Sequence, residues 1–215
     1  MPGRIRLYPN SASGSATIPG MLADAGIGLP NIYSVGVCKP YMTTTGTAST
    51  ILPTELTESE KEVKEIIRKT GNERDRKICW LDIPLLKNNI ELNGITTLGI
   101  THLDGLTKCG EIKICVNYLD KTTNKVVPFT TNRKRLKNIV PNFISLPSWT
   151  EDIGQVTDFA KLPDNAQQLI KTIANLTDTS VSYLTVGPDE IQTILCSVHP
   201  DNPDPNQFDN IDYEV

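Results

Sequence analysis

The chain has 215 residues, of which 38% are hydrophobic and 21% are charged, and its formal net charge is -4 at pH 7. This length fits one large domain or two small ones with a sizeable core. The negative charge gives no electrostatic argument for a nucleic acid or an anionic membrane as partner. No run approaches the roughly 18 apolar residues of a membrane-spanning helix, and the opening MPGRIRLYPN lacks the apolar stretch of a signal peptide.

The cysteines and histidines indicate no disulfide framework and no zinc site. Five cysteines form an odd set without a Cys-x-x-Cys pair, and only two histidines are present. We therefore expect reduced thiols and a cytoplasmic location. The glycine-rich segment 14–30 is not followed by Gly-Lys-Ser/Thr, so it is not a phosphate loop. Such a loop usually connects two elements, and its early position leads us to expect a fragment or a partner chain that supplies a missing half.

The first half of the chain predicts one strand and two helices. The β-formers of 31–42 predict a strand that Pro40 ends. Thr57, followed by Glu60, predicts the start of a helix with a capping box, and Gly71 predicts its end. We further expect Trp80-Leu81-Asp82 to introduce a second helix that reaches about Asn89, with Pro84 in its first turn.

The second half alternates strands with one long helix, which favours an α/β domain on a partly parallel sheet. Pro163 predicts the opening of a helix over 162–179 with one apolar face. The segment 132–149 is interpreted as a connector, first basic and then apolar. An acidic tail over 200–215 follows the main portion, 1–199. The predicted strands are 95–103, 111–120, 125–131, 182–187 and 190–195.

Asp104 is the first candidate for chemistry, because a carboxylate after a strand can meet a ligand at the carboxyl end of an open sheet. A carboxylate only accepts hydrogen bonds. Guanine offers two adjacent donors, the N1–H and the exocyclic amine, whereas adenine offers no such pair. The alternative is that Asp104 caps the turn at Gly105.

Two further candidates have equally plain structural alternatives. Gly187-Pro188 follows a strand, and a glycine leaves its backbone open to a flat ligand; the alternative is an ordinary hairpin turn. Arg74 and Arg76 precede a predicted helix and could grip a carboxylate or phosphate; the alternative is a solvated charge run. The basic cluster 131–137 lacks interleaved aromatic residues, so we interpret it as solvated surface.

The segments that carry these candidates occur in a recognisable order. They are PTEL (53–56), Gly71-Asn72-Glu73, Arg74-x-Arg76, WLD (80–82), NGITTLGITHLDGL (93–106), EIKICVNY (111–118), LPSWTEDI (146–153), LPDNAQQLIKTI (162–173) and VGPDEIQTI (186–194). In this order they resemble the C-terminal portion of the adenylosuccinate synthetase family. Each piece is weak alone, but their common order is hard to obtain by chance.

The resemblance implies both a fold and a reaction. The implied fold is the C-terminal part of a mixed, largely parallel β-sheet flanked by helices, similar to P-loop NTPases. The implied activity is a GTP-dependent ligase of purine biosynthesis. In this family the 6-oxygen of IMP is phosphorylated by GTP in the presence of Mg²⁺, and the amine of L-aspartate then displaces the phosphate to give adenylosuccinate.

Residues are carried over from the family only where they match. Asp104 aligns with the aspartate that reads guanine, and Gly187 aligns with the backbone turn beside that base. Thr185 stands where the family has a serine, and His102 stands where it has a lysine packed on guanine. Arg76 aligns with an arginine near the phosphates, so these five residues form the expected GTP site.

The expected aspartate and IMP site consists of Arg74, Arg76 and Gly46. The two arginines align with family arginines near these substrates, and Gly46 aligns with a backbone contact to the ribose. Two departures weaken this site. A Thr-Thr-Gly loop of the family is absent just before Arg74, and Ser11-Ala12-Ser13-Gly14 replaces a segment with a phosphate-binding threonine.

The family's phosphate loop, catalytic aspartate and catalytic histidine have no counterpart in this sequence. We therefore expect no catalytic residue or magnesium ligand in this segment and no activity of the chain alone. Three alternatives stay open. The chain is part of a longer enzyme, a subunit of a split enzyme that needs an N-terminal partner, or a non-catalytic guanine-nucleotide-binding module. The nucleotide could then be a purine other than IMP, and a homodimer is also expected from the family.

Overall fold

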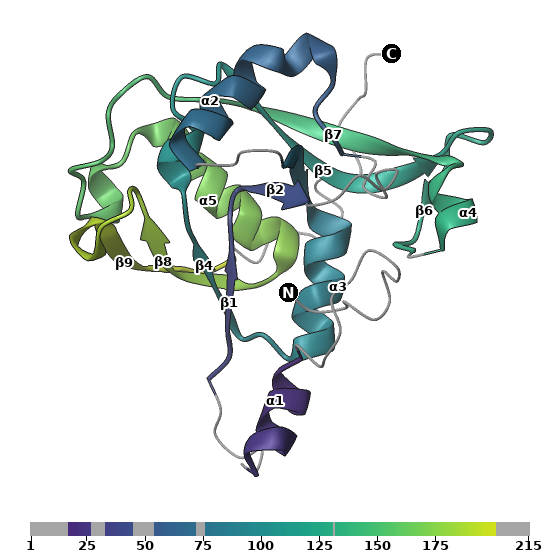
Figure 1. Cartoon of the computed structure of the whole chain (residues 1–215), viewed down its shortest axis with the longest axis horizontal. Helices are drawn as coiled ribbons and strands as arrows, with labels where there is room; N and C mark the ends of the chain where they lie inside the picture. The colour runs from purple at the N-terminus through teal and green to yellow at the C-terminus, as the bar shows by residue number, and fades with distance from the viewer. Residues whose placement is uncertain (1–16, 27–32, 45–53, 72–75, 131, 201–215) are drawn as a thin grey trace.

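The computed structural model describes residues 17–26, 33–44, 54–71, 76–130 and 132–200. Gly46, Arg74, the segment 11–14 and all but the first residue of the expected tail lie outside these ranges. Two β-sheets with helices around them build the described part (Figure 1). The α/β class is confirmed, although the strands divide between two sheets.

The first sheet has four strands in the order β1-β4-β8-β9. They are β1 (Val35–Cys38), β4 (Thr97–Ile100), β8 (Ser180–Thr185) and β9 (Thr193–Val198). The first three run parallel, and β9 returns antiparallel to β8. The carboxyl ends of β1, β4 and β8 therefore lie along one edge of this sheet.

The second sheet is built on β3 and β5, which pair in parallel. Its strands are β2 (Tyr41–Thr44), β3 (Lys77–Asp82), β5 (Glu111–Asp120), β6 (Val126–Val127) and β7 (Ile139–Pro147). Both β6 and β7 pair antiparallel with β5, and β2 pairs antiparallel with β3. Of the predicted strand 125–131, only Val126–Val127 forms a strand, and it pairs with the confirmed strand 111–120.

Pro40 divides the predicted strand 31–42 into two strands of different sheets. β1 ends at Cys38 and β2 begins at Tyr41, so the prediction of a single strand was wrong. Proline has no N–H to continue a ladder. Here the chain leaves one sheet and enters the other across two residues, Lys39 and Pro40.

The helix predicted from Thr57 is confirmed together with its capping box. It consists of the 3-10 turn η1 (Glu58–Glu60) followed by α2 (Lys61–Gly71). The Glu60 carboxylate accepts a hydrogen bond from the backbone N–H of Thr57 at 2.9 Å. This reciprocal pair satisfies N–H groups that the helix itself leaves unpaired.

The segment 77–82, expected in part to introduce a helix, is the buried strand β3. The helix α3 (Ile83–Asn93) starts directly after it and is longer than predicted. The Asp82 carboxylate caps α3 by accepting from the Leu85 N–H at 3.0 Å, and Pro84 lies in the first turn as expected.

The second misassigned segment is 132–149, which holds a short helix and a long strand instead of a connector. These are α4 (Arg133–Leu136) and β7, which pairs with β5 along nearly its whole length. Pro141 and Pro147 argue against a central strand. They are tolerated because the described strands place β7 at an edge, paired only with β5.

The main core joins buried side chains of both sheets with those of α2, α3 and α5. The predicted apolar face of α5 (Asp164–Thr177) is confirmed, since Ala166, Leu169, Ile170 and Ile173 are fully buried. The remaining helical segments are α1 (Ile18–Ala25), η2 (Leu103–Leu106), η3 (Phe159–Lys161) and η4 (Glu190–Gln192).

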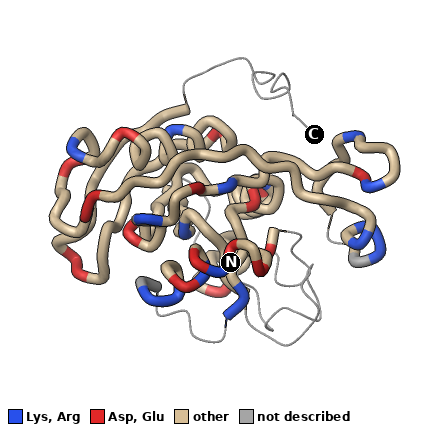
Figure 2. The backbone as a smooth tube through the Cα atoms, turned by 90° about the horizontal axis from the view of Figure 1, so that it is seen from above, with Lys and Arg blue, Asp and Glu red and all other residues tan. Residues whose placement is uncertain are grey.

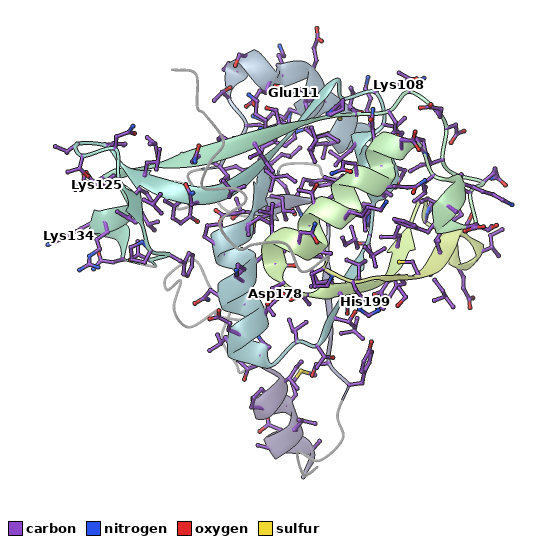
Figure 3. All side chains as sticks on the ribbon, turned by 180° about the vertical axis from the view of Figure 1, so that it is seen from behind. Lys108, Glu111, Lys125, Lys134, Asp178 and His199 are labelled. Carbon is purple, nitrogen blue, oxygen red and sulfur yellow. The ribbon has the colours of Figure 1, made fainter. Side chains whose placement is uncertain are left out.

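Charged residues of both signs are interspersed over most of the fold (Figure 2). Lys134, Arg135 and Lys137 of the basic cluster are exposed, so its interpretation as solvated surface is confirmed for these three. Figure 3 shows Lys134 at one end of the molecule, pointing away from the sheets. None of the helices in the described ranges is long and apolar enough to cross a membrane.

Candidate functional site

The carboxyl ends of the three parallel strands bring together segments that are far apart in the sequence. Thr101 follows β4, and its N–H donates to the Cys38 carbonyl of β1 at 2.8 Å. The N–H of His102 donates to the Thr185 hydroxyl at the end of β8 at 3.2 Å. His102, Asp104 and Thr185 therefore lie in one region, at the edge of an open sheet where ligands commonly bind.

His102 turns the chain sharply out of β4. Its φ of 61° is in the left-handed region, which few residues other than glycine adopt. Burial lowers the pKa of its imidazole, the Lys39 cation lowers it further, and Asp104 opposes both effects. The ring is therefore neutral at pH 7, and its buried Nδ1 has no hydrogen-bond partner among the described residues.

Asp104 lies in the first turn of η2 with its side chain half-buried. Leu103 and Leu106 on either side are fully buried and anchor this turn in the core. Burial raises the pKa of the carboxyl, while His102 and the backbone N–H groups of Asp104 and Gly105 oppose that increase. The carboxylate thus interacts with its own turn, as the structural alternative predicted, and is still partly open to solvent.

Lys39 and Tyr41 lie beside His102 and Asp104, and sequence reasoning did not select either of them. The Lys39 ammonium lies 5.4 Å from the centre of the Tyr41 ring. The Tyr41 side chain is 1% exposed, and its hydroxyl has no hydrogen-bond partner in the described part of the chain. Burial raises the pKa of this hydroxyl, and Asp104 raises it further. The sequence feature that could have pointed to them is that Lys39 and Pro40 directly follow a segment rich in β-forming residues.

Gly187 lies where the hairpin between β8 and β9 turns close to a side chain. A Cβ at this position would lie 2.2 Å from the Gln192 Oε1 atom. Gln192 accepts from the Asp189 N–H at 3.0 Å and donates to the Gly154 carbonyl at 2.8 Å. A larger residue at this position would displace the Gln192 amide from these hydrogen bonds, so the hairpin by itself favours a glycine here. The contact between Gly187 and a guanine base stays a prediction.

Asp152, in the loop before η3, lies near Asp104. Its carboxylate accepts from the Gly154 N–H at 2.9 Å, and its charge contributes to raising the pKa of Asp104. The segment 146–153 was matched to the family, but Asp152 itself was not selected. The hairpin beyond β8 and this loop are joined through Gln192.

Arg76 lies close enough to Lys39 for their charges to interact. Burial lowers the pKa of Lys39, and the positive charge of Arg76 lowers it further. Arg76 and Lys39 line one groove together with Tyr41, whereas Asp104 does not line it. The described residues contain no group of three or more His, Cys, Asp or Glu side chains that could hold a metal ion. They therefore assign no ligands to Mg²⁺.

Comparison with known proteins decides the family. The model of the adenylosuccinate synthetase family matches residues 4–194. The chain belongs to the adenylosuccinate synthetase family. An adenylosuccinate synthetase of Pediococcus pentosaceus is 37% identical over 193 residues, which cover 87% of this chain and 44% of that protein. An adenylosuccinate synthetase of Methanosarcina barkeri is 36% identical over 187 residues, which cover 83% of this chain and 43% of that protein.

A solved structure supports the same assignment at the level of the fold. The fully ligated adenylosuccinate synthetase from Plasmodium falciparum superposes with a TM-score of 0.80 at 29% identity. The superposition covers 88% of this chain and 46% of that one. This member of the adenylosuccinate synthetase family thus spans less than half the length of the relatives that it matches.

Proposed function

We propose that this chain forms the guanine-binding part of a GTP-dependent ligase that joins IMP to L-aspartate. Membership of the adenylosuccinate synthetase family supports the reaction. The observation that carries the proposal is the half-buried Asp104 carboxylate at the carboxyl ends of β1, β4 and β8. There it can accept from the N1–H and exocyclic amine of guanine together, a pair of donors that adenine lacks.

The neighbours of Asp104 have supporting roles in this proposal. The neutral His102 ring stacks on the base in place of the family's lysine, and a neutral ring loses no hydration of a charge when the base covers it. The Thr185 hydroxyl fixes the backbone of His102. Gly187 borders the base, and Arg76 lies toward the phosphates.

Titration calorimetry of the chain with GTP and with ATP tests the proposal. GTP should bind more tightly than ATP, and Asp104→Ala should remove that preference. Two hydrogen bonds to an ionised group are worth about 1.5–3 kcal/mol each, so a loss of GTP affinity of at least about tenfold is expected.

The control for this measurement is Asp24→Ala, which removes an exposed carboxylate on α1 and should leave both affinities unchanged. Asp104→Asn adds a second comparison, because its amide keeps the size of the side chain but replaces one acceptor with a donor. Equal binding of GTP and ATP by the wild-type chain would refute the role of Asp104.

The other substrates, Mg²⁺ and the cytoplasmic location belong to the same proposal. Arg74, Arg76 and Gly46 are the residues proposed to contact L-aspartate and IMP. The alternative is a guanine-nucleotide-binding module without catalysis, or one that uses a different purine nucleotide. It predicts GTP binding with the same dependence on Asp104, but no ligase activity in the presence of the rest of the family's fold.

A further inference from the structure

A groove of about 510 Å³ follows the outer edge of β9, the strand at the opposite end of the first sheet from β1. No strand in the described ranges pairs with this edge. Five consecutive residues, 195–199, line the groove. Because alternate side chains point to opposite faces of a strand, such a lining means that the groove follows the edge itself. The other lining residues are Lys171 of α5 and 158–160, at the start of η3.

The lining of this groove combines exposed apolar and polar side chains. Leu195 is 82% exposed, the largest fraction among the exposed large hydrophobic residues in the described ranges. Phe159 lines the same groove and is partly buried. Among the polar side chains, the Ser197 hydroxyl and the His199 Nε2 atom lie 2.9 Å apart. An uncovered leucine in a groove, beside an aromatic residue, is suited to burial by another polypeptide segment.

The charges of the groove favour an acidic occupant. Lys171 is exposed and pairs with no carboxylate in the described part of the chain. Asp158 is the one carboxylate among the lining residues. It already accepts a hydrogen bond from the Ala160 N–H at 3.0 Å and so caps η3. The groove therefore offers one cation beside an apolar surface.

The segment 201–215 starts at this groove and has the matching composition. His199 follows directly on β9 (Figure 3), and Pro200 is the last described residue. The 15 residues after Pro200 include five Asp or Glu and no Lys or Arg. Fully extended, they would reach about 50 Å, which is ample for a return along a strand of six residues.

The sequence of this segment also has the pattern of an extended docking peptide. Ile211, Tyr213 and Val215 occupy alternate positions, with a carboxylate at each position between them. Such alternation predicts one apolar side and one acidic side when the backbone is extended. Pro203 and Pro205 lie among Asn and Asp residues, a composition that favours a turn. A turn there would direct the following residues back along β9.

We propose that the segment 201–215 docks into the groove of its own chain. Its apolar side chains cover Leu195 and Phe159, and one of its carboxylates pairs with Lys171. The connection through Pro200 is short, so the entropy lost on closing the loop is small. None of the residues proposed to bind guanine lines this groove, so the inference goes beyond the proposed function and does not depend on it.

The thiol of Cys196 reports whether the groove is covered, because Cys196 lines it and is partly exposed. The test compares iodoacetamide labelling of the full chain and of a chain that ends at Pro200, with each cysteine resolved by mass spectrometry. Removal of 201–215 should speed the labelling of Cys196 at least about fivefold, since a docked segment must open before the reagent enters. Cys38 is partly exposed on β1 and should label equally in both chains.

Two variants of the groove test the contacts themselves. In the full chain, Leu195→Glu and Lys171→Glu should each raise the labelling rate of Cys196 toward that of the shortened chain. Each removes a contact and places a negative charge opposite an acidic segment. In the shortened chain, neither should change the rate. Both side chains are exposed, so circular dichroism should show the wild-type fold.

Val126→Glu is the matched control, since Val126 is 62% exposed but lies on β6 of the second sheet. It should leave the labelling of Cys196 at the wild-type rate. Equal rates in the full and shortened chains would overturn the proposal, as would full-chain groove variants that label like the wild type. Light scattering at several concentrations identifies docking between two copies. A dimer that is lost with 201–215 would overturn docking within one chain.

Discussion

At the scale of single residues, Asp82 is the most unusual charge in the fold. It is fully buried, and the Tyr118 hydroxyl approaches both of its carboxylate oxygens at 2.7 Å. Burial raises the pKa of Asp82 to about 6, although the hydrogen bonds from Tyr118 and the Leu85 N–H oppose that increase. The capping of α3 by this group therefore carries a cost above pH 6, where the carboxyl must ionise inside the protein.

Asp82→Asn should remove a pH dependence of the free energy of unfolding. The folded pKa is raised from 3.8, so the folded state holds the proton more tightly between pH 4 and 6. In the wild type, this contribution to stability is fully present below pH 4 and is lost as the pH rises through 6. Between pH 5 and pH 8 the free energy of unfolding of the variant should rise relative to that of the wild type by about 1.4 kcal/mol, because about one pKa unit of the shift lies above pH 5.

Urea unfolding at the two pH values measures this difference. Asp24→Asn, at an exposed position of α1, serves as the control and should follow the wild type at both. Identical pH profiles for wild type and Asp82→Asn would show that the carboxyl does not ionise with a raised pKa.

At the scale of elements, Glu60 connects three of them. Its carboxylate caps η1 and α2 through Thr57, accepts from the Trp80 indole N–H of β3 at 2.8 Å, and pairs with Lys113 of β5 at 3.0 Å. The cap could be predicted from the spacing of Thr57 and Glu60. The contacts with Trp80 and Lys113 could not, because they join residues 20 and 53 positions away.

Glu60→Ala should therefore destabilise the fold more than Thr57→Ala. Loss of the Thr57 cap costs about 1 kcal/mol, whereas loss of Glu60 also leaves the Trp80 N–H without its partner, which adds about 1–3 kcal/mol. Chemical unfolding of both variants compares these values, with Glu58→Ala as an exposed control expected within about 0.5 kcal/mol of the wild type. Equal losses for the two variants would mean that Glu60 acts only as a cap.

At the scale of the whole molecule, the proposed guanine site lies in a chain whose sequence lacks counterparts of the family's catalytic groups. The family's phosphate loop and its catalytic aspartate and histidine have no counterpart in the sequence. Asp104, His102 and Thr185 instead lie at one end of the first sheet, in which β1 is an edge strand among the described strands. Phosphoryl transfer depends on groups positioned around the phosphates, and these would come from the remainder of the fold.

The purified chain should form no adenylosuccinate from IMP, L-aspartate, GTP and Mg²⁺. Chromatographic detection of the product measures this, and the full-length Pediococcus pentosaceus relative provides the positive control. Adding the unmatched part of that relative should produce turnover that Asp104→Ala reduces. Turnover by the chain alone would show that its own residues replace the catalytic groups of the family.

The sequence by itself determined what depends on neighbouring residues. The capping box at Thr57, the apolar face of α5 and the strand 111–120 follow from local spacing, and the family follows from ordered motifs. Only the tertiary structure decided what depends on distant partners. It divided 31–42 between two sheets, made 139–147 a strand through pairing with β5, and placed Lys39 and Tyr41 beside Asp104. Strand pairing and burial join residues far apart in the chain, so no local pattern contains them.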